Sequence, residues 1–210
     1  MNKSRGFTLV EILVVISLLS VFGILILTIF TRTLKGGNKS QIIGIIKQNG
    51  QSVLDSMDKT IRNSDGVVCP VVIPPATIAP SAQIVVVKNG TFTRFRFIAP
   101  VSTTANGLIQ QDNPVKTNVA GSNPLREETD AEFRNRVCNI SDTMPQAAIL
   151  TDTNLQAGVS VENGQFTRDR AAGFKDQVTI KFDLKPGLGV PQSAAGQIDA
   201  VSFQTTIQLR

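Results

Sequence analysis

The sequence lacks histidine, tryptophan and tyrosine, and it has only two cysteines among its 210 residues. Without histidine, the chain has no imidazole for acid–base catalysis and no histidine-ligated metal site. Charged residues are scarce, at 18%, and all aromatic packing falls to 11 phenylalanines. No carboxylate pair or Ser-x-x-Lys sequence lies in a recognisable catalytic context. The sequence therefore predicts a protein that is not an enzyme and that binds no cofactor or metal.

The formal net charge is mildly basic. It is +5 for the whole chain, and removal of a leader containing Lys3 and Arg5 would leave +3 (5 − 2 = 3). Such a charge is compatible with nucleic acid or an anionic surface as a partner, but it argues for neither. The length fits a membrane segment followed by one domain with a single core.

The N-terminal region contains 20 residues, Ile12 to Thr31, without a formal charge. A helix of that length crosses the ~30 Å hydrocarbon core of a bilayer, so we predict a membrane-spanning helix over residues 7–31. An ordinary secretory signal peptide has a shorter apolar segment and an Ala-x-Ala cleavage site, and neither is present. A plain signal anchor, which needs only hydrophobic length, remains an alternative.

Glu11 is the exception in this apolar region. A carboxylate at bilayer depth costs roughly 2.5–3.5 kcal/mol and is rare without a partner. In one interpretation Glu11 lies near the interface and its side chain reaches back to water. In the other, the chain is cut between Gly6 and Phe7, and the new α-amino group of one copy pairs with Glu11 of a neighbour.

Residues 5–11 read RGFTLVE and follow a short basic leader. This segment, with the apolar helix after it, resembles the class III signal of type IV pilins and type II secretion pseudopilins. The resemblance implies that residues 1–6 are a leader, that prepilin peptidase cleaves after Gly6, and that Phe7 is N-methylated. It also implies that Glu11 neutralises the terminal amine of the adjacent subunit during assembly.

The same resemblance implies the partners and the location. The partners are prepilin peptidase, other pilin or pseudopilin subunits, an inner-membrane assembly platform, and membrane lipid before assembly. The expected location is a single-pass membrane protein with an exported C-terminal domain, assembled into a cell-surface or periplasmic filament. The charges flanking the apolar run do not orient the chain by themselves.

The two cysteines, Cys69 and Cys138, allow one pairing within the chain. In an oxidising compartment they could form a disulfide that closes a loop of about 70 residues, worth ~4 kcal/mol in the chain-entropy model. The alternative is a pair of buried free thiols.

Residues 32–63 continue the helix with an amphipathic pattern. Apolar residues recur at steps of three and four, which predicts a face that packs on a sheet; they are Ile42, Ile45, Ile46, Val53, Leu54, Met57 and Ile61. The glycine pair at 36–37 weakens the helix, so we expect bending or local melting between Lys35 and Asn38.

Residues 64–210 read as a β-rich head. An Asn-Gly turn joins strands expected at 83–87 and 91–98, and it is a strong hairpin signal. In the second strand Arg94 and Arg96 share the face opposite to Phe95 and Phe97, so we expect that face to be wet. These two arginines are either tentative nucleic-acid contacts or ordinary solvated side chains.

For the rest of the head, the sequence predicts a less regular structure. Residues around 100–145 form a variable loop insertion, either a partner-recognition site or a loosely packed segment, with one helix expected at 129–137 behind a capping box. Further strands are expected at 147–151, 158–161, 165–168, 178–184 and 201–210, with a second hairpin turn at Asn163-Gly164. The fold class is α+β and pilin-like, a long N-terminal helix packed on an antiparallel sheet.

Within the pilin-like class, the end of the helix and the last strand are similar to W-class minor pilins and J-class minor pseudopilins. The predicted function is accordingly a minor structural subunit of a type IV pilus or related extracytoplasmic filament. The alternatives are a J-type minor pseudopilin of a type II secretion system, a DNA-uptake (competence) pilin-like subunit, and a membrane-anchored domain that never polymerises.

Overall fold

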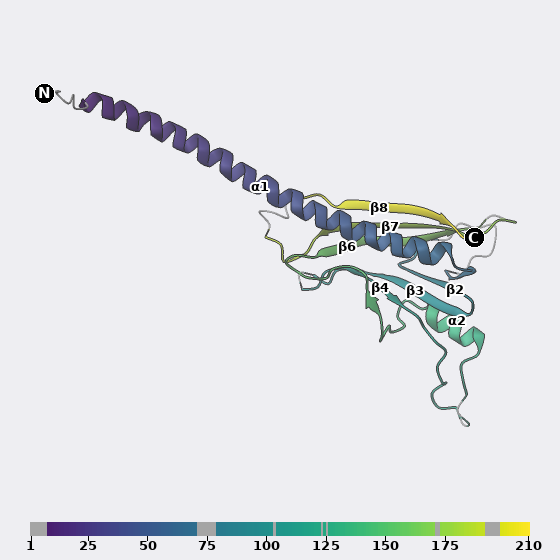
Figure 1. Ribbon diagram of the computed structural model, residues 1–210. Coiled ribbons are helices and arrows are strands. Elements are labelled where there is room, and N and C mark those ends of the chain that lie inside the picture. The colour runs from purple at the N-terminus through teal and green to yellow at the C-terminus, as the bar shows by residue number, and fades with distance from the viewer. Residues whose placement is uncertain are drawn as a thin grey trace. The chain divides into compact units, whose positions relative to one another are not determined.

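The computed structural model describes residues 8–70, 79–102, 104–122, 124, 126–170, 173–191 and 198–210. The chain divides into two compact units, Met1–Gln41 and Ile42–Arg210. Helix α1, Leu9–Arg62, begins in the first unit and ends in the second (Figure 1). The described part of the first unit is the apolar half of this helix, and its side chains are exposed.

Helix α1 continues without interruption through Gly36 and Gly37. The expectation of local melting between Lys35 and Asn38 is therefore wrong for this structure. A Cβ at either glycine would meet nothing within 4 Å, so no packing contact requires them. The surrounding helix tolerates their propensity cost of ~1 kcal/mol each, because hydrogen bonding on both sides propagates through the pair.

In the second unit, α1 is buried along one face, which confirms the amphipathic pattern and the packing on sheets. The buried residues of the helix are Ile46, Gly50, Val53, Leu54, Met57 and Ile61. The helix ends where the N–H and Oγ of Ser64 both donate to the C=O of Ile61, at 3.1 and 2.7 Å.

The described residues of the head form two antiparallel sheets and a short helix (Figure 1). The first sheet has the order β1-β2-β3-β4-β5, with bounds Gly66–Cys69, Gln83–Lys88, Thr91–Ile98, Leu108–Asp112 and Ala148–Ile149. The second has the order β6-β7-β8, with bounds Val159–Asp169, Gln177–Pro186 and Val201–Gln208. Helix α2 is Asp130–Cys138.

The main core draws side chains from α1 and from both sheets. Phe97 of the first sheet connects the two sheets, because its ring centroid lies 4.7 Å from that of Phe166 and 5.7 Å from that of Phe182. Within the second sheet, the rings of Phe182 and Phe203 stack with centroids 5.3 Å apart. Offset and tilted aromatic contacts of this kind add to simple area burial. Phenylalanine thus supplies the aromatic packing that the missing tryptophan and tyrosine would otherwise share.

Backbone hydrogen bonds join the two sheets at one corner. Ser81 and Phe166 exchange two N–H to C=O bonds of 2.9 and 2.7 Å, and the N–H of Val161 donates to the C=O of Gly107 at 2.9 Å. A Cβ on Gly107 would collide with the Val161 carbonyl group, so glycine is required at this close approach.

The two Asn-Gly pairs behave differently. Asn89 and Gly90, with φ of 48° and 77°, form the predicted β2–β3 turn. The predicted hairpin at Asn163-Gly164 is wrong, because β6 is one strand that pairs with β7 on both sides of a bulge between Glu162 and Gln165. The ring of Phe97 occupies the space where a Cβ of Gly164 would stand. Glycine therefore serves packing at this position rather than a chain reversal.

The insertion is more ordered than its sequence indicates. Strand β4 was not expected, and it pairs with β3 in five consecutive residue pairs from Arg94↔Asp112 to Ile98↔Leu108. Helix α2 confirms the expected helix, and Thr129 and Glu132 form the predicted capping box.

Candidate assembly segment and the clamped insertion

The first site is the start of α1. Thr8 Oγ1 accepts the N–H of Glu11 at 3.3 Å, and Glu11 Oε2 accepts the N–H of Thr8 at 3.5 Å. These reciprocal bonds are a capping box that satisfies two N–H groups at the helix end. The sequence contains the signal of this capping box as Thr8-x-x-Glu11.

The helix that follows exposes its apolar surface on all sides. The large apolar side chains from Leu9 to Leu34 are 49–76% exposed. Within the part of the chain that the structure describes, α1 is the one helix long and apolar enough to cross a membrane. A helix that is apolar all round is suited to lipid or to other helices, not to water. Gly6 and Phe7, the predicted processing residues, lie outside the described residues, so cleavage and methylation stay predictions.

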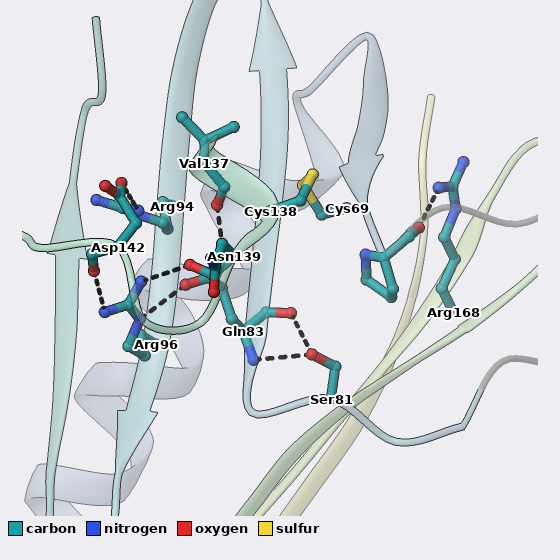
Figure 2. The surroundings of a disulfide bond; sticks show 11 residues. Cys69, Ser81, Gln83, Arg94, Arg96, Val137, Cys138, Asn139, Asp142 and Arg168 are labelled. Atoms are coloured by element: carbon teal, nitrogen blue, oxygen red, sulfur yellow. Dashed lines mark hydrogen bonds and ion pairs between the residues drawn. A yellow bond between two sulfur atoms is a disulfide. The ribbon is translucent and has the colours of Figure 1, made fainter. Parts of the chain in front are cut away.

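The second site is the disulfide between Cys69 and Cys138, which confirms the predicted pairing and excludes free thiols in this structure (Figure 2). Cys69 ends β1 and Cys138 ends α2, and their Cα atoms are 5.6 Å apart. A small second core surrounds the bond, formed by Val85, Phe133 and Val137. The disulfide therefore fastens the C-terminal end of α2 to the edge of the first sheet.

Arg168 provides a second anchor beside this edge. Its guanidinium donates to both oxygens of Asp176, at 3.1 and 2.8 Å, and to the C=O of Pro70 at 2.7 Å. Arg168 and Asp176 are 5% and 7% exposed. This buried pair ties β6, in the second sheet, to the residue that follows Cys69.

Arg94 is 1% exposed and is the centre of a charged cluster. It donates to both oxygens of Asp112, at 2.9 and 2.6 Å, to Asp142 Oδ2 at 2.7 Å, and to the C=O of Thr143 at 3.1 Å. Burial alone would lower the pKa of Arg94, but the hydrogen bonds and charges of Asp112 and Asp142 raise it. The guanidinium is therefore fixed in its charged form between β4 and the segment after α2.

Arg96, 8% exposed, makes its bonds to neutral acceptors. It donates to Gln83 Oε1 at 2.7 Å and to the carbonyl oxygens of Asp142 and Asn139 at 2.7 and 3.5 Å (Figure 2). Burial and the nearby charge of Arg94 lower its pKa. Gln83, at the start of β2, also donates to the C=O of Val137 at 2.7 Å, so this strand holds the C-terminal end of α2.

The expectation of a wet face on β3 is wrong, and the tentative assignment of Arg94 and Arg96 to nucleic acid loses its basis with it. Both side chains are buried because α2 and residues 139–143 cover this face of the strand. Their donors are directed at carboxylates and carbonyl oxygens of the same chain, which leaves little surface for an external phosphate.

Arg136 completes the cluster from α2. It donates to both oxygens of Glu128, at 2.7 and 2.9 Å, and to the C=O of Val115 at 2.7 Å. The hydrogen bonds from Arg136, together with the N–H of Thr117, lower the pKa of Glu128 to about 2 although burial opposes this. Glu128 is consequently ionised throughout the neutral range.

The segment between Thr117 and Glu128 is closed at its base. The N–H of Glu128 donates to the C=O of Thr117 at 2.9 Å, and the N–H of Val119 donates to the C=O of Arg126 at 2.9 Å. The tip, around Gly121, is exposed. This part of the insertion is thus a short excursion whose two ends are hydrogen-bonded to each other.

The cluster combines three guanidiniums with three carboxylates, and each buried side-chain polar atom of the described residues has a hydrogen-bond partner. Such a satisfied network has no unpaired acid, base or nucleophile to offer a substrate. The described residues contain no group of histidine, cysteine, aspartate and glutamate that could hold a metal ion. The cluster therefore has a structural role, since its ion pairs and hydrogen bonds hold the insertion on the first sheet.

Comparison with known proteins identifies a family at the N-terminal end of the chain. The family model described as the prokaryotic N-terminal methylation motif matches residues 1–29. The chain matches no curated protein and no solved structure. The motif implies processing by prepilin peptidase and assembly with other pilin subunits. This chain therefore carries the prepilin signal of the type IV pilin-like class at the head of a long apolar helix.

Proposed function

We propose that the chain is a minor structural subunit of a type IV pilus or related extracytoplasmic filament, processed after Gly6 and assembled through α1. The observation that carries the proposal is an apolar helix, exposed on all sides, with one carboxylate in its first turn. The methylation motif over residues 1–29 supports it independently. A surface of this kind is buried by lipid before assembly and by neighbouring helices afterwards.

The proposed assembly step uses Glu11. In the single chain its carboxylate accepts one long hydrogen bond, from the N–H of Thr8 at 3.5 Å. An ionised carboxylate has about four acceptor positions, so capacity remains for a cation. Cleavage after Gly6 would create an α-amino group on Phe7, and pairing of that amine with Glu11 of a neighbour neutralises both charges within the apolar bundle.

The proposed roles of the segments follow their order along the chain. Residues 1–6 are the leader, 7–31 the segment for the membrane and the fibre core, 32–63 the amphipathic continuation, and 64–210 the head. The clamped insertion gives the head a distinctive surface, which favours a minor subunit of the W or J class. A J-type minor pseudopilin of a type II secretion system would share these features, and gene neighbourhood distinguishes the two.

The test is the substitution Glu11→Ala in the full-length chain. We expect normal processing and membrane insertion, but at least about tenfold less subunit in sheared filaments, because an unpaired charge in hydrocarbon costs roughly 2.5–3.5 kcal/mol. Mass spectrometry of the mature N-terminus, membrane fractionation and quantitative detection in the filament fraction measure the three steps separately.

Asp55→Ala is the matched control, since Asp55 is an exposed acid on the same helix outside the apolar run. This variant should assemble normally. Incorporation of Glu11→Ala at the level of the unaltered chain would contradict the assembly step, and a mature protein that still begins at Met1 would contradict the proposed processing.

A further inference from the structure

Apart from Lys3 and Arg5 of the leader, the net positive charge of this chain comes from one stretch of α1. From Asp55 to Arg210 there are 15 basic and 15 acidic residues, so this part is neutral (15 − 15 = 0). Between Glu11 and Asp55 there is no acidic residue at all. That interval contains four cations, which are Arg32, Lys35, Lys39 and Lys47.

Three of these cations form a stripe along the helix. Arg32, Lys35 and Lys39, here called the basic stripe, are spaced by three and four residues, and such positions share one side of an α-helix. All three side chains are exposed. Within the described residues, none of them takes part in an ion pair or a side-chain hydrogen bond, whereas Arg94, Arg136 and Arg168 of the head are all paired.

The stripe also lies at a defined depth. Arg32 is the first residue after the uncharged run of Ile12 to Thr31. At 1.5 Å rise per residue, Lys35 and Lys39 follow it by about 4.5 and 10.5 Å along the helix axis. The headgroup layer is about 5–8 Å thick on each side of the hydrocarbon core. Arg32 and Lys35 would therefore lie within this layer, and Lys39 close enough for its flexible side chain to reach it.

We propose that the basic stripe binds the phosphate groups of anionic phospholipids at the membrane surface where α1 leaves the bilayer. Arg32 can donate two parallel hydrogen bonds to one phosphate, while the two lysines act as point charges beside it. The contact would fix the depth of the subunit in the membrane before assembly. The proposal depends on the membrane insertion assumed above, but not on polymerisation.

The experiment uses the full-length chain in nanodiscs of phosphatidylcholine with a minor share of phosphatidylglycerol. Native mass spectrometry measures the ratio of the two lipids that remain bound. We expect a preference for phosphatidylglycerol that weakens with added salt. In the triple variant R32Q/K35Q/K39Q the preference should fall toward the ratio in the bulk bilayer, by up to about fivefold for each cation lost.

Glutamine keeps helix propensity close to that of lysine and arginine, so loss of charge is the main change. The control is K47Q, which removes an exposed lysine from the same acid-free interval about two helical turns after Lys39. This variant should retain the full lipid preference.

An unchanged lipid ratio in the triple variant would overturn the proposal, as would an equal loss in K47Q. If the triple variant keeps its lipid ratio but fails to enter filaments, the stripe instead faces carboxylates of neighbouring subunits, and the lipid proposal is also wrong. Failure of the chain to enter nanodiscs at all would contradict the membrane helix itself, and it is visible before any lipid ratio is measured.

Discussion

Arg94 and Arg96 show that the alternation pattern of a strand predicts which face a side chain lies on, but not whether that face is buried. Their alternation with phenylalanine gave the correct faces of β3 but the wrong environment. The residues that cover them, Asp112 and Asp142, lie 18 and 48 positions from Arg94 in the sequence. No local pattern links such positions, so burial of the arginine face could not be predicted. The two cysteines, in contrast, had one possible partner each, and the disulfide was predicted correctly.

Asp112→Ala tests the charged cluster at the residue scale. It removes both oxygens that hold Arg94 Nε and Nη2, and it leaves a guanidinium that is 1% exposed with only Asp142 to balance it. We expect a loss of about 3–5 kcal/mol in the free energy of unfolding, because breaking one side of a buried ion pair uncovers a desolvated charge.

Urea unfolding of the purified full-length chain in detergent measures this loss. Asp58→Ala is the control, since Asp58 and Arg62 form a half-exposed pair on α1 and its removal should change stability far less. Equal losses in the free energy of unfolding for the two substitutions would show that burial of the Arg94–Asp112 pair does not determine how much the pair contributes to stability.

At the scale of elements, the sequence predicted what depends on local periodicity. The buried stripe of α1, the β2–β3 hairpin and the capping box of α2 follow from residues at most a few positions apart. The Asn163-Gly164 turn failed because the demand for glycine comes from the ring of Phe97 on another sheet. Strand β4 was missed for a related reason, since its pairing with β3 is supported by the Arg94–Asp112 contact rather than by an alternating pattern.

Two glycines of α1 provide a matched prediction. A Cβ at Gly50 would overlap the ring of Phe203, which stacks on Phe182, whereas a Cβ at Gly44 would meet nothing within 4 Å. Gly50→Ala should therefore destabilise the head by about 1–3 kcal/mol through overpacking. Gly44→Ala should stabilise it by roughly 0.5–1 kcal/mol through helix propensity. Both values come from the same unfolding measurement, and opposite signs are the diagnostic result.

At the scale of the whole molecule, the α+β class and the long N-terminal helix were predictable because the apolar run and the β-branched segments are separate along the chain. The division of the strands into two sheets was not, since it depends on contacts such as Ser81 with Phe166 and Gly107 with Val161. The same limit applies to function, because the motif at residues 1–29 does not extend to the head.

We predict that the disulfide stabilises the folded chain as a whole. Cys69 and Cys138 are separated by 69 residues, and the chain-entropy model assigns such a loop about 4 kcal/mol. Reduction should lower the thermal midpoint of the purified chain while the charged cluster keeps the insertion in place. The double variant C69A/C138A should match the reduced protein. An unchanged midpoint after complete reduction would contradict a stabilising role.

The closed base of the excursion between Thr117 and Glu128 has a practical consequence. Hydrogen bonds between backbone groups, and from the N–H of Thr117 to the Glu128 carboxylate, hold its two ends together. A change at the exposed tip near Gly121 should therefore not alter the sheet. The tip is therefore the place to insert a short epitope or a cysteine for a fluorophore. A label there would allow the chain to be followed in living cells with its fold intact.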